Sequence, residues 1–550
     1  MMKWWGWGSE GVEFPMQHKP NLWPWICQEL GIPPDARPTR PVPRSAIVLD
    51  KPVIHQGFLA AVEKTLKPGR TARGEDERLL HAYGKSYPDL LRVRRGQVDR
   101  APDVVILPEG HADVEAVVFE AQRHNVCVIP FGGGTNIVGG VNPVDRSGRM
   151  VVSLDLRDMA RVLAVDEQSQ TATIEAGALG PTLEQELQRR GWSLGHHPDS
   201  FEFSSLGGWL ATRSAGMQSD AYGKIEDMVV ALRMVTPLGT LTTRPAPRAA
   251  TGPDLNQVAV GSEGVLGVIT EATMRVHRNP PVRSYHGFLF PTFEAGHAAI
   301  YECVTGGFPP SLFRLSDARE TELAFQMKSP DAGLKRLVTQ AFKRYLAGRG
   351  YGAPCLMITG FEGDPAAVAA LRAGAFRILK RHQGFHLGTK VGDSWSREKY
   401  NLPYLRDYVM DYGVMADVAE TSTVWSNLLP LYHGAKKTLE DRFRADGKGF
   451  YLGCHISHTY KTGASLYFTF AAHMTPGKEL EEYYRYKRLV TETFVTHGGT
   501  LSHHHAVGIE HQDWFEREVT PTGVRALRGL KAGLDPQGIM NPGKLIPPGD

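Results

Sequence analysis

Alternating apolar and polar positions divide residues 101–280 into short segments with strand or helix character. The apolar runs "DVVILP" and "VCVIPF" are typical of buried strands, and they flank "HADVEAVVFEAQRHN" (111–125), whose apolar residues recur with a helical period. Strands are also predicted in "MVVSLDL", "RVLAVDEQSQTATIEAGA" and "VVALRMVTPLGTL", and a helix in "TLEQELQRRG", which ends at Gly191. These mixed elements predict an α+β domain.

A double proline in "VHRNPPVRS" (276–284) marks a boundary after this domain. Beyond it, the pattern predicts amphipathic helices over 331–348 and 365–383, and strands in "PCLMITGFEG" and "ASLYFTFAAHM". Residues 281–495 are therefore expected to form a second α+β domain. Residues 496–550 follow as a C-terminal segment, which begins near "LSHHHAVG".

The first 100 residues have a different character. Residues 33–45 are rich in proline and predict an extended linker, and residues 58–91 have helical patches. Five of the ten tryptophans lie within the first 25 residues. Such indoles either fix an N-terminal arm onto the body of the protein, or sit at a membrane surface or along an acyl chain. Residues 1–100 are expected to form an N-terminal arm and a helical region.

Composition narrows the class of protein. The 62 basic and 59 acidic residues nearly balance, at a net charge of +3, which argues against a nucleic-acid partner. The five cysteines are scattered without a CxxC pair, so a disulfide framework and a zinc ribbon are not expected and a reducing compartment fits. No signal peptide, membrane-spanning run or peroxisomal tripeptide is visible. A cytoplasmic location is expected, with room for peripheral attachment to a membrane.

The segment "IPFGGGTNIVGG" (129–140) follows a predicted strand and is the first candidate for ligand binding. It is neither a GxGxxG motif nor a P-loop, because Ile137 replaces the third glycine and no Gly-Lys-Ser/Thr follows. Consecutive glycines let a backbone approach a ligand closely, and their N–H groups can surround anionic oxygens. A simple tight turn is the alternative. Three more stretches rich in Gly, Ser and Thr, at 196–216, 224–239 and 261–276, favour a long cofactor with two phosphates.

These motifs, in this order, resemble the flavin-binding half of the vanillyl-alcohol oxidase/PCMH superfamily. The resemblance implies a two-subdomain PCMH-type FAD-binding domain with an α+β cap domain over the flavin, and FAD held non-covalently although His196 and His197 lie near a flavin-contacting stretch. The residues it assigns to FAD are Pro130, Phe131, Gly132, Gly133, Gly134, Thr135, Asn136, Asp199, Ser200, Phe201, Glu202, Phe203, Ser204, Ser205, Thr212, Arg213, Ser214, Ala215, Glu263, Gly264, Val265, Leu266, Gly267, Val268 and Ile269.

Within the superfamily, the chain is similar to the alkyldihydroxyacetonephosphate synthase (alkylglycerone-phosphate synthase) family. The shared pieces include "MKWWGWG", "GHHPDSFEFSSLGGWLATRSAGM", "TYKTGASLYFTF" and "GGTLSHHHAVG". The resemblance implies an ether-lipid synthase that exchanges the acyl group of acyl-dihydroxyacetone phosphate for a long-chain fatty alcohol. That exchange involves no net redox change and runs through a covalent adduct at flavin N5. The resemblance also implies a homodimer, and an apolar tunnel that opens toward a membrane surface.

Site residues follow from the same resemblance, and their side-chain chemistry suits the roles. Tyr467 and the triplet His503, His504 and His505 are expected to move a proton at the substrate carbon, because imidazoles titrate near neutral pH. The resemblance assigns Arg406 to binding an anionic group of the substrate. It also matches Arg248 to a second family arginine that is important for activity and is expected to bind substrate. In an extended segment, His503 and His505 would share one face and His504 the other. Purely structural roles are the alternatives. The histidine triplet would then serve only in packing, Tyr467 would be a core tyrosine, and Arg406 would form a salt bridge with Asp407 or Asp411.

Other interpretations stay open at this point. The His503-x-His505 spacing also suits a metal, but nearby acidic partners are sparse, so no metal is assigned. The ending "DPQGIMNPGKLIP" resembles flavin D-lactate and glycolate dehydrogenases, which makes an FAD-dependent 2-hydroxy-acid dehydrogenase or oxidase the second candidate. In that enzyme Arg406 would hold the substrate carboxylate. A flavin-carrying scaffold protein without activity is the third.

Overall fold

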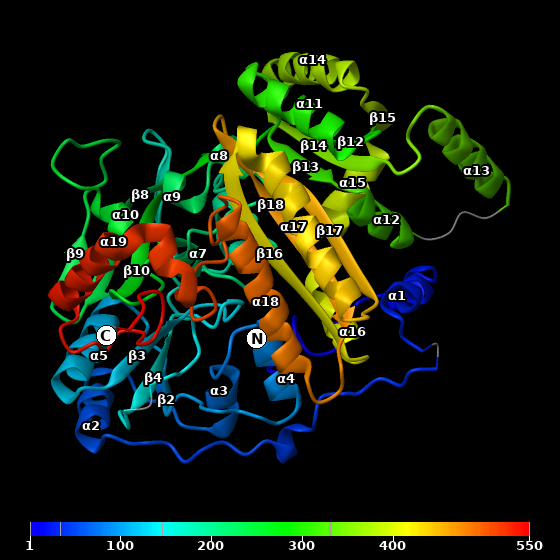
Figure 1. Cartoon of the computed structure of the whole chain (residues 1–550). Helices are drawn as coiled ribbons and strands as arrows, with labels where there is room; N and C mark the ends of the chain where they lie inside the picture. Colours follow the sequence, from blue (N-terminus) through cyan, green and yellow to red (C-terminus); the bar gives the residue numbers. More distant parts are fainter. Residues whose placement is uncertain (1, 34, 146, 329–332, 549–550) are drawn as a thin grey trace.

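The structure is a computed structural model that describes residues 2–33, 35–145, 147–328 and 333–548. Two bodies make up most of the chain (Figure 1). The double-sheet region (residues 71–278) contains a four-stranded and a five-stranded sheet, and the cap (residues 282–496) is built on one seven-stranded sheet. The mixture of sheets and helices in both bodies agrees with the α+β prediction.

The four-stranded sheet has the order β1-β2-β4-β3, with β2, β3 and β4 parallel. Helix α5 packs against it because Val114, Val117, Val118 and Ala121 recur on one face and are all buried. The helix ends where Asn125 adopts a left-handed conformation with φ 52°. The elements of this part are β1 (Thr71–Ala72), β2 (Val104–Ile106), β3 (Cys127–Phe131), β4 (Val151–Asp155), α2 (Gln56–Thr65), α3 (Glu75–Leu80), α4 (Tyr87–Arg94) and α5 (His111–His124).

The five-stranded sheet has the order β5-β6-β10-β8-β9 and is antiparallel throughout. Helix α6 ends at Arg189, two residues before the predicted stop at Gly191, whose φ is 82°. Strands β7 and β11 pair as a separate two-stranded antiparallel sheet. The elements of this part are β5 (Val162–Asp166), β6 (Thr171–Glu175), α6 (Gly180–Arg189), β7 (Trp192–Ser193), α7 (Leu206–Thr212), α8 (Ser219–Tyr222), α9 (Ile225–Met228), β8 (Val229–Thr236), β9 (Gly239–Thr242), α10 (Leu255–Ala259), β10 (Val268–Arg275) and β11 (His277–Arg278).

The cap sheet has the order β15-β12-β14-β13-β17-β18-β16, and its pairs are antiparallel. Side chains alternate between its faces, so Phe288 and Phe290 of β12 enter one apolar cluster and Leu289 enters another. Its strands are β12 (Val282–Phe290), β13 (Leu312–Ser316), β14 (Cys355–Gly363), β15 (Phe385–Gly388), β16 (Val414–Val424), β17 (Phe450–Thr459) and β18 (Gly463–His473).

Helices cover both faces of this sheet (Figure 1). The predicted helix 331–348 corresponds to α13, although residues 331 and 332 lie outside the described residues. The predicted helix 365–383 corresponds to α14. The cap helices are α11 (Phe293–Thr305), α12 (Ala318–Gln326), α13 (Gly333–Gly348), α14 (Pro365–Arg381), α15 (Lys390–Glu398), α16 (Leu402–Met410), α17 (Trp425–Ala445) and α18 (Glu479–Thr496).

The N-terminal arm lies on the cap. Its helix α1 (Leu22–Leu30) contacts β17, β18 and α12, and Trp7 joins the same apolar cluster as Leu22 and Ile26. Trp23 packs on Tyr408 and Tyr412 of the α16 region at ring centroid distances of 5.4 and 4.2 Å. The tryptophans therefore attach the N-terminal arm to the body of the protein, which was the first of the two roles expected from the sequence.

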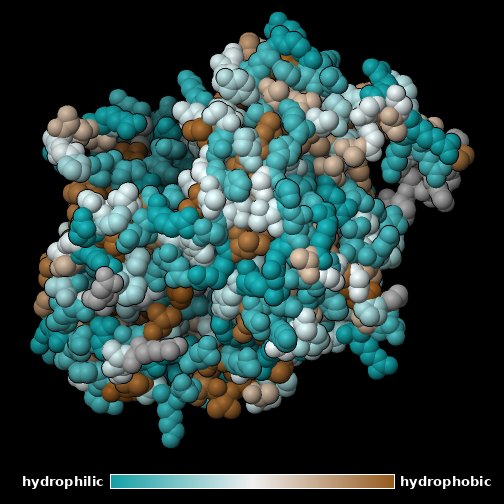
Figure 2. All heavy atoms as spheres, viewed as in Figure 1, coloured by the Kyte–Doolittle hydropathy of each residue, from teal (hydrophilic) through white to brown (hydrophobic). Residues whose placement is uncertain are grey.

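The last segment returns to the double-sheet region. Helix α19 (Gln512–Leu534) packs there through Trp514, Phe515 and Val524, and Met540 forms a parallel bridge with Val128 of β3. Hydrophilic residues cover most of the face viewed in Figure 2, with apolar residues scattered among them. Within the described ranges, no helix is long and apolar enough to cross a membrane.

Candidate active site

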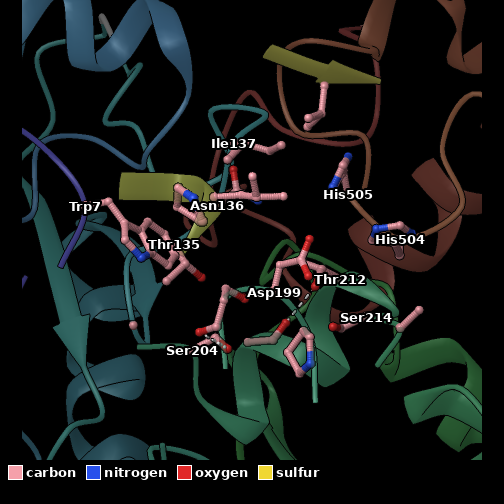
Figure 3. Close-up of a pocket in the computed structure, with 18 of the residues that line it drawn as sticks. Trp7, Thr135, Asn136, Ile137, Asp199, Ser204, Thr212, Ser214, His504 and His505 are labelled. Carbon is pink, nitrogen blue, oxygen red and sulfur yellow. Dashed lines mark hydrogen bonds between the residues drawn. The ribbon is translucent and has the colours of Figure 1, made fainter. Parts of the chain in front are cut away.

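A cavity of about 420 Å³ lies where the double-sheet region, the cap, the N-terminal arm and the C-terminal segment meet (Figure 3). Nineteen of the residues assigned to FAD line it: Pro130, Phe131, Gly132, Gly133, Gly134, Thr135, Asn136, Asp199, Ser200, Ser204, Ser205, Thr212, Ser214, Ala215, Glu263, Gly264, Gly267, Val268 and Ile269. Two of the three glycine-rich stretches, 196–216 and 261–276, are thus brought together with the loop of 129–140, whereas no residue of 224–239 lines the cavity.

Six other residues assigned to FAD do not line this cavity. Phe201 stacks on Tyr400, and Phe203 packs edge-on against Trp7. The guanidinium of Arg213 donates to the Gln257 carbonyl, on the side of the backbone away from the cavity. Of the remaining three, Glu202 is exposed to solvent, and Val265 and Leu266 lie in the apolar core.

The glycine loop is shaped by close contacts with the segment that precedes α7. A Cβ on Gly133 would lie 1.6 Å from the Phe203 carbonyl oxygen, and one on Gly132 would lie 2.2 Å from Ser205 Oγ. Gly134 adopts φ +66°, which favours glycine. Asn136 Oδ1 then accepts from the N–H of Gly140 at 2.6 Å and fixes the end of the loop. Only residues without side chains can pack this closely on the segment before α7 while the loop backbone borders the cavity.

One carboxylate organises the histidine triplet. Glu420 of β16 accepts from Ser502 Oγ at 2.7 Å and from the successive backbone N–H groups of His503, His504 and His505. The segment therefore bends around the carboxylate instead of running extended. His504 and His505 line the cavity, while His503 turns toward Tyr460, whose hydroxyl lies 2.6 Å from Nε2. The alternation expected for an extended segment is wrong here.

The imidazoles that line the cavity are neutral at neutral pH. Burial lowers the pKa of His504 to about 3 and that of His505 to about 4, although the nearby Glu420 acts in the opposite direction. Glu420 itself stays ionised. Burial alone would raise its pKa, but the facing imidazoles and the donated hydrogen bonds lower it to about 2. The site thus combines a fixed negative charge with unprotonated imidazoles.

Tyr467 of β18 faces the same imidazoles. It is paired with Glu420 and with His455 in the sheet register, and its ring lies nearly parallel to that of His504 at 5.9 Å. Burial raises the pKa of its phenol well above the ordinary value, so the phenol keeps its proton. The structure brings Tyr467, His504 and His505 to one wall of the cavity, as the resemblance implied.

Two arginines line the cavity, and only one of them was expected. On α16, Arg406 donates through Nη1 to the Lys85 carbonyl at 2.7 Å. Its buried Nε and Nη2 have no acceptor among the described residues. Neither Asp407 nor Asp411 pairs with it; Asp411 pairs with Arg94 and Arg40 instead. The second, Arg314 of β13, contacts His455 and Glu320.

Arg248 does not reach the cavity. It is exposed in the loop between β9 and α10. Sequence reasoning missed Arg314 and Glu420. Arg314 is a lone charge inside the apolar strand pattern "SLFRLS", and Glu420 is one of two acidic residues, with Asp417, in "VMADVAETSTV". Burying a charged side chain on the inner face of a strand costs free energy unless it has a partner. A charge in an apolar strand pattern was therefore the sequence signal that could have identified these residues.

Two groups in this wall are close enough to hold a metal ion: His458, His503 and His504, and Glu420, His504 and His505. Some of their atoms have hydrogen-bond partners, including Tyr460 for His503 and the backbone N–H groups for Glu420. The buried Nδ1 of His458 has none among the described residues.

Comparisons with known proteins identify the two bodies. The family model "FAD binding domain" matches residues 102–244, and "FAD linked oxidases, C-terminal domain" matches residues 279–545. The chain is 43% identical to alkyldihydroxyacetonephosphate synthase of Dictyostelium discoideum over 91% of this chain and 82% of that protein. It is 40% identical to the Trypanosoma brucei brucei protein of the same name, over 91% and 82%.

Solved structures agree. A structure of alkyldihydroxyacetonephosphate synthase matches with a TM-score of 0.87 at 38% identity, over 99% of both chains. p-Cresol methylhydroxylase shares the fold, with a TM-score of 0.68 at 15% identity over 89% of this chain and 97% of its own. The α+β fold with a PCMH-type FAD-binding domain is therefore confirmed, as is FAD as the cofactor. D-lactate dehydrogenase of Arabidopsis thaliana is more distant, at 26% identity over 88% and 79%.

Proposed function

The chain belongs to the alkyldihydroxyacetonephosphate synthase family of FAD-dependent proteins, and we propose that it forms the ether bond for which the family is named. Acyl-dihydroxyacetone phosphate would lose its fatty acid, and a long-chain fatty alcohol would take the vacated position, without net oxidation. The observation that carries this proposal is the meeting of two neutral imidazoles, a buried phenol and two guanidinium groups beside a glycine loop, all in one cavity.

FAD fits the double-sheet wall of the cavity. Gly132 and Gly133 let the loop pack closely on the segment before α7, so its backbone borders the cavity, and Thr135, Ser204 and Thr212 place hydroxyl oxygens along it. When bound, FAD supplies the electron-poor ring system that lets one group on the substrate be exchanged for another. We expect it to be held non-covalently. Of the two histidines considered for a covalent link, His196 is buried beneath Trp209 and contacts Ser214, while His197 lines the cavity with its Nδ1 3.3 Å from the Tyr400 hydroxyl.

The polar wall of the cap is suited to moving a proton at the reacting carbon. An unprotonated imidazole of His504 or His505 can accept that proton, and the Tyr467 hydroxyl can relay or return it. Both groups need to be present together, because the reaction removes a proton in its first half and restores one in its second. Glu420 stabilises the imidazolium that forms in between, since its carboxylate lies 3.2 Å from His505 Nδ1.

The two guanidinium groups suit the anionic parts of the substrate. The free Nε–Nη2 edge of Arg406 is a planar fork that matches a carboxylate or phosphate. Such an edge, buried without an acceptor, is costly unless a ligand completes it. Arg314 is held by Glu320 and His455 and adds positive charge to the same cavity.

The far end of the cavity suits an alkyl chain. It is lined mainly by apolar side chains of the N-terminal arm, α12, α16 and the cap strands: Trp25, Ile26, Leu30, Leu323, Leu405, Val409, Val414, Ala416 and Ala471. These side chains offer no hydrogen bonds to a ligand, but they exclude water and reward a long apolar substituent. The fatty alcohol and the acyl chain of the donor would occupy this end in turn.

We also propose that the protein attaches to a membrane surface through α13. This helix follows α12, whose Leu323 lines the apolar end of the cavity, and it projects from the cap (Figure 1). It exposes 62% of Leu337, together with Tyr345 and the basic side chains of Lys343 and Arg344. Apolar and basic residues on one short helix favour an interface position. The proposal also includes a cytoplasmic location, peripheral attachment to the membrane, and assembly of the protein as a homodimer.

Supplying acyl-dihydroxyacetone phosphate with a radiolabelled fatty alcohol tests the function. The proposal expects a labelled ether lipid that survives alkaline hydrolysis of esters. The second candidate, a 2-hydroxy-acid dehydrogenase, rests on the distant relatives and on the carboxylate-binding capacity of Arg406. It predicts instead that D-lactate or glycolate bleaches the flavin under anaerobic conditions. Labelled ether without such bleaching supports the synthase, and bleaching without ether supports the dehydrogenase.

A further inference from the structure

Two residues far apart in the chain, one in the N-terminal arm and one in α16, have buried N–H donors without an acceptor among the described residues. They are Trp7, through its indole Nε1, and Arg406, through Nε and Nη2. Both residues line the cavity, and Trp7 is only 4% exposed. Figure 3 shows the Trp7 ring on the side of the cavity where Thr135 and Asn136 of the glycine loop lie. The arm therefore contributes a polar group to the site as well as apolar packing.

The position of this indole is set by hydrogen bonds around Arg406. The backbone N–H of Trp7 donates to Asp407 Oδ2 at 2.5 Å, one residue after Arg406. Lys85 connects the same parts, because its Nζ donates to the Lys3 carbonyl at 2.6 Å and its own carbonyl accepts from Arg406. Gly6 allows the approach, since a Cβ there would lie 2.3 Å from Asp407 Oδ2. The indole and the guanidinium are thus fixed relative to each other.

Positive charge prevails around these donors. Lys3, Lys85 and Arg406 outnumber the carboxylate of Asp407, while Arg94 and Asp411 pair with each other. An unpaired buried donor costs free energy that a bound acceptor recovers, and three such donors on two residues of one cavity suit an acceptor with several oxygens. Phosphate has three such oxygens and binds to guanidinium forks and indole N–H groups alike. A neutral ligand would leave the charge uncompensated.

We propose that Trp7 is a phosphate-binding residue, and that its indole N–H and the free edge of Arg406 together form a phosphate subsite. Two phosphates would be available there, the pyrophosphate of FAD and the headgroup phosphate of the substrate. The second source rests on the proposed function, whereas the first requires only that FAD binds. In both cases the N-terminal arm is part of the binding site, and removing the indole nitrogen weakens binding of the phosphate compound.

The test compares Trp7→Phe, which keeps an aromatic ring but removes the donor, with Trp23→Phe on the same arm. Trp23 packs on Tyr408 and Tyr412 and is not among the residues that line the cavity. Three quantities are measured: the Kd of FAD for the apoprotein, the Kd of inorganic phosphate and of dihydroxyacetone phosphate for the holoprotein, and the KM of the acyl substrate. 3-Benzothienylalanine at position 7, which matches indole in shape but lacks the N–H, serves as a second variant if Trp7→Phe folds poorly.

Loss of one charge-assisted hydrogen bond is expected to weaken binding about tenfold. A raised Kd for FAD assigns the indole to the cofactor pyrophosphate, and raised values for phosphate, dihydroxyacetone phosphate and the acyl substrate assign it to the headgroup. Values within about twofold of those of Trp23→Phe for every ligand, in the benzothienylalanine protein, overturn the proposal. If the wild-type protein makes no ether lipid but its phosphate binding depends on Trp7, the proposed function fails and the subsite stands.

Discussion

The carboxylate of Glu420 accepts the backbone N–H of His505 at 2.8 Å and lies 3.2 Å from Nδ1 of the same residue. A single buried side chain therefore determines both the path of the histidine segment and the electrostatics of an imidazole that faces the cavity. Glu420 is opposite Tyr467 in the sheet register, so one strand pair places the phenol and the support of the imidazoles together. This relationship connects the cap sheet to the proposed chemistry.

Replacing Glu420 with Gln should impair catalysis and stability together. The amide keeps the shape but removes the charge and offers one oxygen where four donors converge. Breaking such a buried network costs about 3 kcal/mol of unfolding free energy, and kcat should fall by at least about tenfold because the imidazolium loses its counter-ion. Glu518→Gln is the matched control, since Glu518 accepts the N–H of Leu501 outside the cavity. Equal effects of the two variants on kcat would argue against a role for Glu420 beyond folding.

The neutral histidines predict that stability falls with acidification. The folded-state pKa values of His504 and His505 are lowered to about 3 and about 4, below an unfolded value of about 6.5. The unfolded chain therefore binds more protons below about pH 6.5, and stability present above that pH is lost as the pH falls toward the folded values. Between about pH 7 and about pH 5, each histidine should cost about 2 kcal/mol.

Urea denaturation of wild-type protein and of His504→Asn at these two pH values measures this effect. The variant should lose less stability on acidification than the wild type. In turnover, the histidines should leave kcat/KM flat down to about pH 5, with no limb at the ordinary histidine pKa. A wild-type profile with a limb near about pH 6.5 that disappears in the variant would show that the imidazoles titrate normally and that the cavity is wetter than its burial indicates.

Substitution of Arg406 by Lys should raise the KM of the acyl substrate by about tenfold or more, because an ammonium cannot replace a planar fork. The melting temperature should change little, since the lysine ammonium can replace Nη1 as donor to the Lys85 carbonyl, and FAD content should change little where the free edge of Arg406 binds the substrate headgroup. Arg248→Ala is the informative comparison, because Arg248 is exposed and does not line the cavity. If both variants lost activity equally, the role that the family resemblance gives to Arg248 would hold and its position here would need another explanation.

Attachment through α13 predicts that Leu337→Asp weakens binding to vesicles that contain anionic lipids. Among the described side chains of the helix, Leu337 is the most exposed apolar one. A charge there removes its insertion energy, and a fall of several-fold in the bound fraction is expected. Leu238→Asp is the control, because Leu238 is exposed to a similar extent in the turn between β8 and β9. Co-sedimentation with vesicles measures both. Equal binding by the two variants would exclude α13 as the contact surface.

The fold was predictable from sequence where local pattern decides it. The apolar period of 111–125 gave α5, and the runs around it gave β2 and β3. The glycines of 132–134 were singled out as a ligand-binding loop, and the structure adds that a Cβ on each would collide with neighbouring protein atoms. Long-range contacts decide the rest. Only the packed structure shows that Glu420 bends the histidine segment, that Arg314 reaches the cavity, and that Arg248 does not.

The most direct measurement follows the oxygen of the fatty alcohol. Acyl-dihydroxyacetone phosphate is incubated with an alcohol that carries a heavy oxygen isotope, using the wild type, Tyr467→Phe and, as control, Tyr486→Phe, whose hydroxyl contacts Asp446 in the cap away from the cavity. The account predicts that the wild type and Tyr486→Phe place the heavy oxygen in the ether product and release unlabelled fatty acid, while Tyr467→Phe makes no ether although it still binds FAD. Heavy oxygen in an ester of the fatty acid, or full activity of Tyr467→Phe, would contradict it.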